Sequence, residues 1–188
     1  VELGAEAVAR ACAAGAEAGL NGSVSFAAGD ASRLPLPDAS VDAVLCECSL
    51  CLFEDKRGVV GEMTRVLRPR GRVVIADVTV RAGGLPAPLQ SVAGRIACVA
   101  DALSLDGYER LLRDAGLEVE VREQHREAVA RMVDRIEARL RAARIIRVPV
   151  LEPFRAELDT AIELARATKR AIADDIVGYA LIAACRPG

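Results

Sequence analysis

Two short apolar runs, separated by a segment with helical spacing, lie near the middle of the chain. The runs are residues 41–46 and 72–80, and the segment between them, 55–68, repeats its apolar side chains every three or four positions before Pro69. Apolar runs of this length are typical of strands buried on both faces, and a helix between two such strands joins parallel neighbours. The pattern predicts an α/β fold with a mostly parallel sheet, helices on both faces, and a ligand crevice at the carboxyl ends of the strands.

Periodicity and end signals assign the rest of the chain in the same way. They predict helices at 5–19, 104–113, 125–146 and 154–173, and strands at 24–28, 117–121 and 176–185. The two long helices separate the last strand from the others, which divides the chain into a core, residues 1–124 and 175–188, and a helical insertion, residues 125–174. We expect the insertion to serve as a lid or as the contact of a homodimer. A plain helical layer packed on the sheet is the structural alternative.

The overall composition narrows the classes of partner. The chain has 188 residues and a net charge of −2, and this length suits a single domain or a small protein with two sections. Its 52% hydrophobic and 28% charged residues exclude disorder for most of the chain, and balanced charges with 3% aromatic residues argue against a nucleic-acid partner. Neither an apolar run of about 18 residues nor a signal peptide is found, so we expect no membrane partner and a cytoplasmic location.

Three of the six cysteines crowd into the segment Cys46-Glu47-Cys48-Ser49-Leu50-Cys51. In a chain too large to need disulfide staples, this spacing suggests thiols that are kept reduced, with a soft ligand as one use for them. Packing as small apolar side chains is the alternative, and we expect it for Cys12 and Cys185. A closed zinc site needs four ligands, and only Cys98 offers a fourth, so no metal site is predicted.

Acidic residues fall where the predicted crevice lies. Glu2 precedes the helix that starts at Ala5, at the position of a strand end, where a carboxylate can accept hydrogen bonds from both ribose hydroxyls of a nucleotide. Asp30, in Gly29-Asp30-Ala31, follows the next predicted strand, where a side-chain acceptor can meet an adenine amino group. The loop after Cys46 forms the third lip of the same crevice.

Several motifs of the chain resemble the class I S-adenosylmethionine-dependent methyltransferases, in the branch related to quinone-biosynthesis and arsenite methyltransferases. The resemblance rests on Asp30, Leu34-Pro35-Leu36-Pro37-Asp38, Val41-Asp42-Ala43-Val44-Leu45, and Glu62-Met63 followed by Arg65-Val66-Leu67-Arg68-Pro69-Arg70-Gly71-Arg72. It extends from Glu2 to about Val121. It implies a Rossmann-like sheet and S-adenosylmethionine as cofactor. By the same resemblance, Glu2 with Leu3 holds the ribose, Asp30 with Ala31 addresses the adenine, and Cys46 lies beside the methionine part.

The chain departs from this family at its beginning. The family's Gly-rich loop, between the first strand and the first helix, would precede Glu2, and no G-x-G-x-G motif occurs in this sequence. The family's first strand would lie between the strand that ends at Glu2 and the strand that begins at Val41. We therefore expect an N-terminally incomplete sheet with an exposed apolar edge, and weak or no cofactor binding.

The resemblance also suggests a substrate. Cys48 and Cys98 match two cysteines of the arsenite methyltransferases, one after the fourth strand and one between the fifth strand and the next helix. Trivalent arsenic prefers sulfur ligands, its lone pair can attack a sulfonium methyl group in line, and such a reaction needs no general base. No catalytic residue is therefore assigned, and the single histidine, His125, is expected to have a structural role.

Other functions remain open at this point. A small organic acceptor, quinone-type or other, would be methylated on carbon or oxygen. A non-catalytic, thiol-rich protein on the same fold would bind a metalloid without methylating it. A nucleotide-dependent oxidoreductase would share the role of Glu2, but it leaves the match from Asp30 to Gly71 unexplained. The sequence therefore predicts a small-molecule or metalloid substrate.

Overall fold

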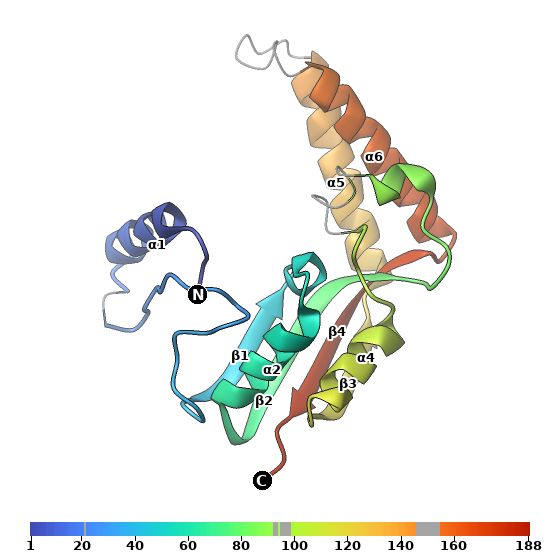
Figure 1. Ribbon diagram of the computed structural model, residues 1–188. Helices are drawn as coiled ribbons and strands as arrows, with labels where there is room; N and C mark the ends of the chain where they lie inside the picture. Colours follow the sequence, from blue (N-terminus) through green and yellow to red (C-terminus); the bar gives the residue numbers. More distant parts are fainter. Residues whose placement is uncertain (21, 92–93, 95–98, 146–154) are drawn as a thin grey trace.

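The computed structural model describes residues 1–20, 22–91, 94, 99–145 and 155–188 (Figure 1). Its helices and strands follow in the order α1 (Ala5–Glu17), β1 (Val41–Glu47), the 3₁₀ turn η1 (Leu50–Leu52), α2 (Lys56–Val66), β2 (Leu67–Val80), the 3₁₀ turn η2 (Ala87–Gln90), α4 (Leu105–Asp114), β3 (Glu118–Gln124), α5 (Arg126–Ile145), α6 (Arg155–Ala173) and β4 (Val177–Cys185). Helix and strand alternate through the centre of the chain, which confirms the predicted α/β class.

The four strands form one sheet in the order β1-β2-β4-β3. β1 runs parallel to β2, with Cys46 opposite Ile75, whereas β4 is antiparallel to both β2 and β3. β1, β2 and β3 thus run in one direction, as the prediction of a mostly parallel sheet requires, and β4 is the antiparallel exception among the strands described. The reason lies in the last connection. β3 ends at the same end of the sheet as β2. Because α5 and α6 form a hairpin that returns the chain to this end, β4 must run in the opposite direction (Figure 1).

The junction of α2 and β2 differs from its predicted position. The Asp55 side chain caps α2 by accepting a hydrogen bond from Gly58 N (2.8 Å), as its place before the helix suggests. The helix ends at Val66, and β2 begins directly at Leu67 rather than at residue 72. The register between β1 and β2 shifts at the start of the pair, so the segment around Pro69 is an irregular part of the strand.

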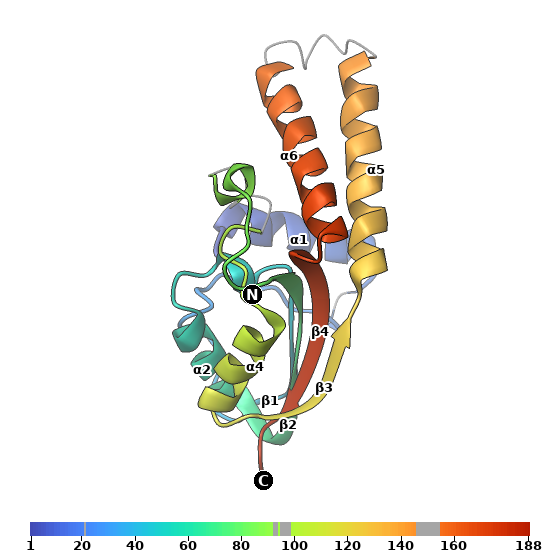
Figure 2. The ribbon, with the colours of Figure 1, turned by 90° about the vertical axis from the view of Figure 1, so that its right-hand side faces the viewer.

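Helices α2 and α4 cover one face of the sheet (Figure 2). The α4 helix is capped by Ser104, whose Oγ accepts a hydrogen bond from Gly107 N (3.0 Å), in agreement with the sequence. The helical spacing places apolar side chains of both helices toward the sheet. The resulting core contains Val59, Val60 and Met63 of α2, Tyr108, Leu111 and Leu112 of α4, and Val73, Ile75 and Ile182 of the sheet.

Helices α5 and α6 pack side by side and project beyond the end of the sheet (Figures 1 and 2). A second buried cluster joins their base to the strands: it includes Val129 and Val133 of α5, Ala171 and Ile172 of α6, and Val78 and Val177 of the sheet. The role of residues 125–174 as a lid or dimer contact stays a prediction. In the described part of the chain, no helix combines the length and the apolar character needed to cross a membrane.

Two packing predictions for β1 and its neighbourhood are wrong. Residues 24–28 form no strand, because Ala28 makes only an isolated parallel bridge with Glu2, and a single bridge is too short to build a ladder. β1 is not buried on both faces: the side chain of Cys46 is 6% exposed, but that of Leu45 is 70% exposed. The cause is that α2 and α4 lie on the Cys46 side of the sheet only.

Two cysteines were expected to pack as small apolar side chains. Cys12 is exposed on α1, so this prediction is wrong for it. The α1 helix has no buried residue, because it lies apart from the sheet and its inner side meets little more than Phe26, whose ring limits the space at Gly15. Cys185, at the end of β4, is half-buried.

Candidate functional site

A cavity of about 680 Å³ lies along β1, on the side of the strand that does not pair with β2. All five residues predicted to hold the cofactor line it: Glu2, Leu3, Asp30, Ala31 and Cys46. They come from three segments that are up to 44 residues apart in the sequence, 2–3, 30–31 and 46. The tertiary fold thus brings these five residues to one cavity, and the volume of this cavity suits a small-molecule ligand.

Glu2 lines this cavity from an extended segment. Its backbone N donates to Ala27 O and its backbone O accepts from Gly29 N, each at 3.0 Å. Its Oε1 atom accepts a hydrogen bond from Leu3 N at 2.9 Å, just before the start of α1. Among the described residues, Oε2 of Glu2 has no hydrogen-bond donor, so this oxygen is available to a ligand hydroxyl.

Asp30, which also lines the cavity, is held in a tight turn. Its Oδ1 atom accepts hydrogen bonds from the backbone N and from Oγ of Ser32, both at 2.8 Å. These bonds, with the backbone one first, lower the pKa of Asp30. A side chain at Gly29 would place Cβ 2.7 Å from Cδ of Pro35, so this close turn requires glycine.

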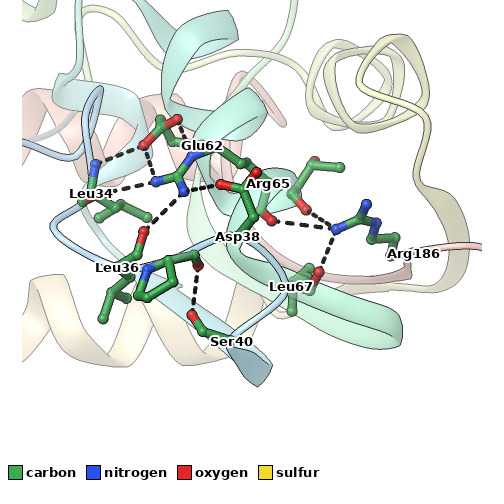
Figure 3. Close-up of polar contacts among 10 residues, drawn as sticks. Leu34, Leu36, Asp38, Ser40, Glu62, Arg65, Leu67 and Arg186 are labelled. Atoms are coloured by element: carbon green, nitrogen blue, oxygen red, sulfur yellow. Dashed lines mark hydrogen bonds and ion pairs between the residues drawn. The ribbon is translucent and has the colours of Figure 1, made fainter.

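An arginine on α2 ties down the loop that forms another wall of the cavity (Figure 3). Arg65 donates to the backbone O of Leu34 (3.1 Å) and of Leu36 (2.9 Å). It also pairs with Asp38 Oδ1 (2.6 Å) and, through two nitrogens, with Glu62 at 2.7 and 2.8 Å. The Arg65 guanidinium in turn lowers the pKa of Glu62, chiefly through the side-chain hydrogen bond.

The sequence analysis assigned no role to this clamp. Glu62 also accepts a hydrogen bond from Leu34 N (2.8 Å), so both polar backbone groups of Leu34 are bound to α2. Leu34 and Leu36 line the cavity. The spacing of Glu62 and Arg65, three residues apart on a helix, is a signal for an ion pair, but it does not show which loop the pair will hold.

A buried carboxylate holds the turn after β1. Asp77 in β2 is 1% exposed, and its two oxygens accept hydrogen bonds from Cys51 N (3.0 Å) and from Val78 N (2.8 Å). The first bond anchors η1. In the sequence, Asp77 stands as one polar residue in an apolar run, so no motif points to it, although a charged side chain in a buried strand is itself a signal of a special role.

The two predicted site cysteines on this turn have different surroundings. Cys46 is buried, and its Sγ lies 3.2 Å from Ser49 Oγ. Burial is the main cause that raises the pKa of the Cys46 thiol. Cys48 is half-buried, and its Sγ lies 3.3 Å from the phenol oxygen of Tyr179, in β4. Cys48 lies at the carboxyl end of β1, next to Glu47, which lines the cavity.

Other predictions have more limited outcomes. Cys98 lies outside the described residues, so its expected pairing with Cys48 stays a prediction. Within the part of the chain that the structure describes, no three histidine, cysteine or acidic side chains are grouped as a metal site would require. His125 does not line the cavity along β1. Its side chain is 43% exposed, and its Nε2 atom lies 3.1 Å from Oε2 of Glu123.

Comparison with known proteins finds similarity to methyltransferases. Residues 1–75 match a family model described as "Methyltransferase domain". The chain is 38% identical over 99 residues to the arsenite methyltransferase of Halobacterium salinarum, a match that covers 50% of this chain and 24% of that protein. It is 48% identical over 63 residues to the demethylmenaquinone methyltransferase of Deinococcus radiodurans, covering 34% of this chain and 26% of that protein.

A solved structure shows the same fold over nearly the whole chain. This is the geranyl diphosphate C-methyltransferase of Streptomyces coelicolor A3(2), in complex with Mg²⁺, geranyl diphosphate and S-adenosyl-L-homocysteine. The TM-score is 0.75 at 18% identity, and the match covers 98% of this chain and 62% of that chain. The present chain therefore spans less than two thirds of the length of each protein named here.

Proposed function

We infer that this chain carries a portion of a class I S-adenosylmethionine-dependent methyltransferase, and that the cavity along β1 holds the cofactor. The observation that carries this proposal is that Glu2, Leu3, Asp30, Ala31 and Cys46 all line one cavity. The match of residues 1–75 to a methyltransferase domain supports it independently. The shared fold alone would not decide an activity, because one fold can serve many functions.

The residues of the cavity fit the chemistry of this cofactor. Carboxylate oxygens of Glu2 and Asp30 in the cavity lining suit ribose hydroxyls and an adenine amino group, which are hydrogen-bond donors. Apolar side chains such as Leu34, Leu36 and Met63 line the same cavity and suit the flat face of a base. When bound, the cofactor supplies a methyl group on a positively charged sulfur.

For the acceptor, we infer a thiophilic metalloid such as arsenite, held by Cys48 and, outside the described residues, by Cys98. Thiolates are the preferred ligands of soft centres, and Cys48 lies at the carboxyl end of β1, beside the cavity. Held there, an arsenic lone pair would form a bond to the methyl carbon while the carbon–sulfur bond breaks and sulfur keeps the electron pair. The role of the protein is to position the two reactants in line.

A small organic acceptor of quinone type, methylated on carbon or oxygen, is the second candidate. The similarity to a demethylmenaquinone methyltransferase favours it, since the identity over the matched segment is 48%. The third candidate, a metalloid-binding protein without activity, needs the thiols but not the cavity. The three candidates therefore differ in what they require of Cys48 and of the cofactor.

Cofactor binding is tested by titrating S-adenosyl-L-homocysteine into the ¹⁵N-labelled chain and following amide chemical shifts into the millimolar range, so that even weak binding is detected. We expect saturable shifts at residues 2–3, 30–31 and 46. Glu2→Gln should weaken binding by about three- to tenfold through the loss of a charged acceptor. Glu6→Gln, on the exposed side of α1, is the matched control and should change nothing. The absence of saturable shifts, or shifts confined to other regions, overturns the proposal.

The acceptor is tested by incubating the protein with arsenite and S-adenosylmethionine and measuring methylated arsenic by mass spectrometry. We expect Cys48→Ser and Cys98→Ser each to abolish the product, and Cys185→Ser, at the far end of β4, to retain it. Methylated arsenic that survives both changes contradicts the assignment of Cys48 and Cys98 as its ligands, and no methylated arsenic from the unchanged chain leaves the organic acceptor. Arsenite that binds without cofactor and yields no methyl product supports the non-catalytic candidate.

A further inference from the structure

Tyr179 in β4 contacts β2 and the residue that follows β1, at the end of the sheet where the candidate site lies. It is the third residue of β4, and in the sheet it pairs with Val78 of β2. Its phenol oxygen donates a hydrogen bond to the backbone O of Ala76 (3.1 Å), in β2, and lies 3.3 Å from Sγ of Cys48, just after β1. One side chain therefore fixes the thiol of a residue that is 131 positions away in the sequence.

The backbone of Cys48 is held at the same point. Its N–H donates to Ala76 O at 2.9 Å, so this carbonyl accepts hydrogen bonds from both Cys48 and Tyr179. Cys48 has a φ of 48°, in the left-handed region that a cysteine rarely adopts. Such a conformation is strained and persists only where the surroundings enforce it. The backbone thus directs the Cys48 side chain toward Tyr179.

A count of protons shows what the phenol can do for the sulfur. A tyrosine hydroxyl has one proton and two acceptor lone pairs. While the sulfur of Cys48 is protonated, the phenol gives its proton to Ala76 O and accepts the S–H group. When the sulfur carries a negative charge, the phenol can turn and donate to it instead. Burial, followed by the hydrogen bond with Cys48, raises the pKa of Tyr179, so the phenol keeps its proton and stays a donor.

We propose that Tyr179 is the positioning residue for the thiol of Cys48: it holds Sγ in one orientation and provides it with a hydrogen bond in both protonation states. This inference rests on the proposed function only in taking Cys48 as the group that meets the acceptor. Tyr179 itself does not participate in methyl transfer. Neither a family motif nor helical or strand spacing pointed to this residue, because the contact is made across three strands.

The test measures the reactivity of Cys48 directly, without cofactor or acceptor. The folded chain is alkylated with iodoacetamide at one pH, and the modification of Cys48 and of the exposed Cys12 is followed by peptide mapping, so that Cys12 is the reference within each sample. We expect Tyr179→Phe to lower the Cys48-to-Cys12 rate ratio about fivefold, since the thiolate is the reacting species and loses a hydrogen-bond donor.

Tyr108→Phe is the matched control, because the Tyr108 hydroxyl likewise donates to a backbone carbonyl, Val78 O (3.2 Å), but does not contact Cys48. This variant should leave the ratio unchanged, whereas Tyr179→Phe should change the ratio while the melting curve stays cooperative. An equal or higher ratio in Tyr179→Phe overturns the proposal, because a purely structural tyrosine would not alter the reactivity of one thiol.

A second measurement keeps the proposal testable if Tyr179→Phe does not fold. The chain contains two tyrosines, so Tyr108→Phe protein produced with 3-fluorotyrosine carries the fluorinated ring at position 179 alone. The ring keeps its size, while fluorine makes the phenol a stronger donor. We expect a higher Cys48-to-Cys12 ratio than in unlabelled Tyr108→Phe, and an unchanged ratio contradicts the proposal. A ratio that responds as expected, in a protein that neither binds S-adenosyl-L-homocysteine nor methylates arsenite, would count against the proposed function only.

Discussion

At the scale of single residues, three polar side chains hold distant segments of the site in place. None of the three is among the ligands expected from the motifs. Asp77 holds η1, Arg65 holds the loop around Leu34, and Tyr179 holds Cys48. Each acts on a segment distant in sequence. A buried or bound backbone group has a large cost when its partner is removed, so these three residues are the natural targets for substitution.

Asp77→Asn keeps the shape of the side chain but replaces one acceptor oxygen with an amino group, which then faces the N–H of Cys51 or of Val78. We expect the free energy of unfolding to fall by about 1–3 kcal/mol, because one buried donor loses its partner. Urea denaturation measures it. Asp42→Asn, whose carboxylate is 83% exposed, is the control and should stay within about 0.5 kcal/mol of the parent. Equal stability of the two variants would show that Asp77 does not anchor η1.

Arg65→Lys retains the charge and loses the planar fork that binds Glu62 through two nitrogens and reaches both carbonyl groups of the loop. We expect amide hydrogen exchange at Leu34, whose N–H is bound by Glu62, to become at least about threefold faster. Arg68→Lys, in an exposed pair with Asp42, is the matched control and should leave this amide unchanged. An unaffected Leu34 amide in Arg65→Lys would mean that the clamp adds nothing to loop order.

At the scale of elements, local signals located most helices and strands well. Ser104 caps the helix predicted at 104–113, and α4, α5, α6 and β4 lie within a few residues of their predicted limits. Helix periodicity and capping depend on neighbours along the chain, and such neighbours are visible in a sequence. The strand predicted at 24–28 is absent. A strand needs a neighbouring strand to pair with, and the sequence does not show which segments become neighbours.

The α5–α6 hairpin contains a nearly buried carboxylate. The side chain of Glu137 in α5 is 8% exposed and accepts hydrogen bonds from Arg141 (2.9 Å) in its own helix and from Lys169 (3.2 Å) and Arg166 (3.3 Å) in α6. These partners, Arg141 first and Lys169 next, lower the pKa of Glu137 from 4.5 to about 2. The carboxylate therefore joins the two helices only while it is charged.

The pH dependence of the Glu137 contribution follows from this shift. Because the pKa is lower in the folded state, the stabilisation is complete above the ordinary value of 4.5 and is lost as the pH falls toward about 2. We expect Glu137→Gln to melt at a lower temperature than the parent at pH 7, and the gap to narrow below pH 4.5. Circular dichroism melts from pH 7 to pH 3 measure it. Glu127→Gln, 89% exposed on the same helix, should show no gap at any pH, and a gap for Glu137→Gln that is constant with pH would refute the argument.

At the scale of the whole molecule, the sheet is covered unequally. α2 and α4 cover one face, α5 and α6 reach the end of the sheet, and the cavity lies along the unpaired side of β1 (Figure 2). The exposure of Leu45, 70%, follows from this arrangement, whereas Leu67 on the covered side is 0% exposed. The two leucines therefore report on the two faces of the sheet.

Leu67→Ala should lower the free energy of unfolding by about 2–5 kcal/mol, as for a leucine removed from a packed core. Leu45→Ala should change it by no more than about 0.5 kcal/mol, since little apolar surface leaves water there on folding. Urea denaturation of both variants measures the difference. A cost for Leu45→Ala that approaches the cost for Leu67→Ala would show that β1 is covered on both faces in solution.

The sequence by itself determined the α/β class, the positions of most elements and the family resemblance, because helix periods, apolar runs, caps and motifs are properties of neighbouring residues. Only the tertiary structure decided that Glu2, Asp30 and Cys46 line one cavity, that β4 runs antiparallel, and that the thiol of Cys48 meets Tyr179. These facts depend on which distant segments pack together. Side-chain packing across strands leaves no periodic pattern along the chain, and so it is seen only when the chain is folded.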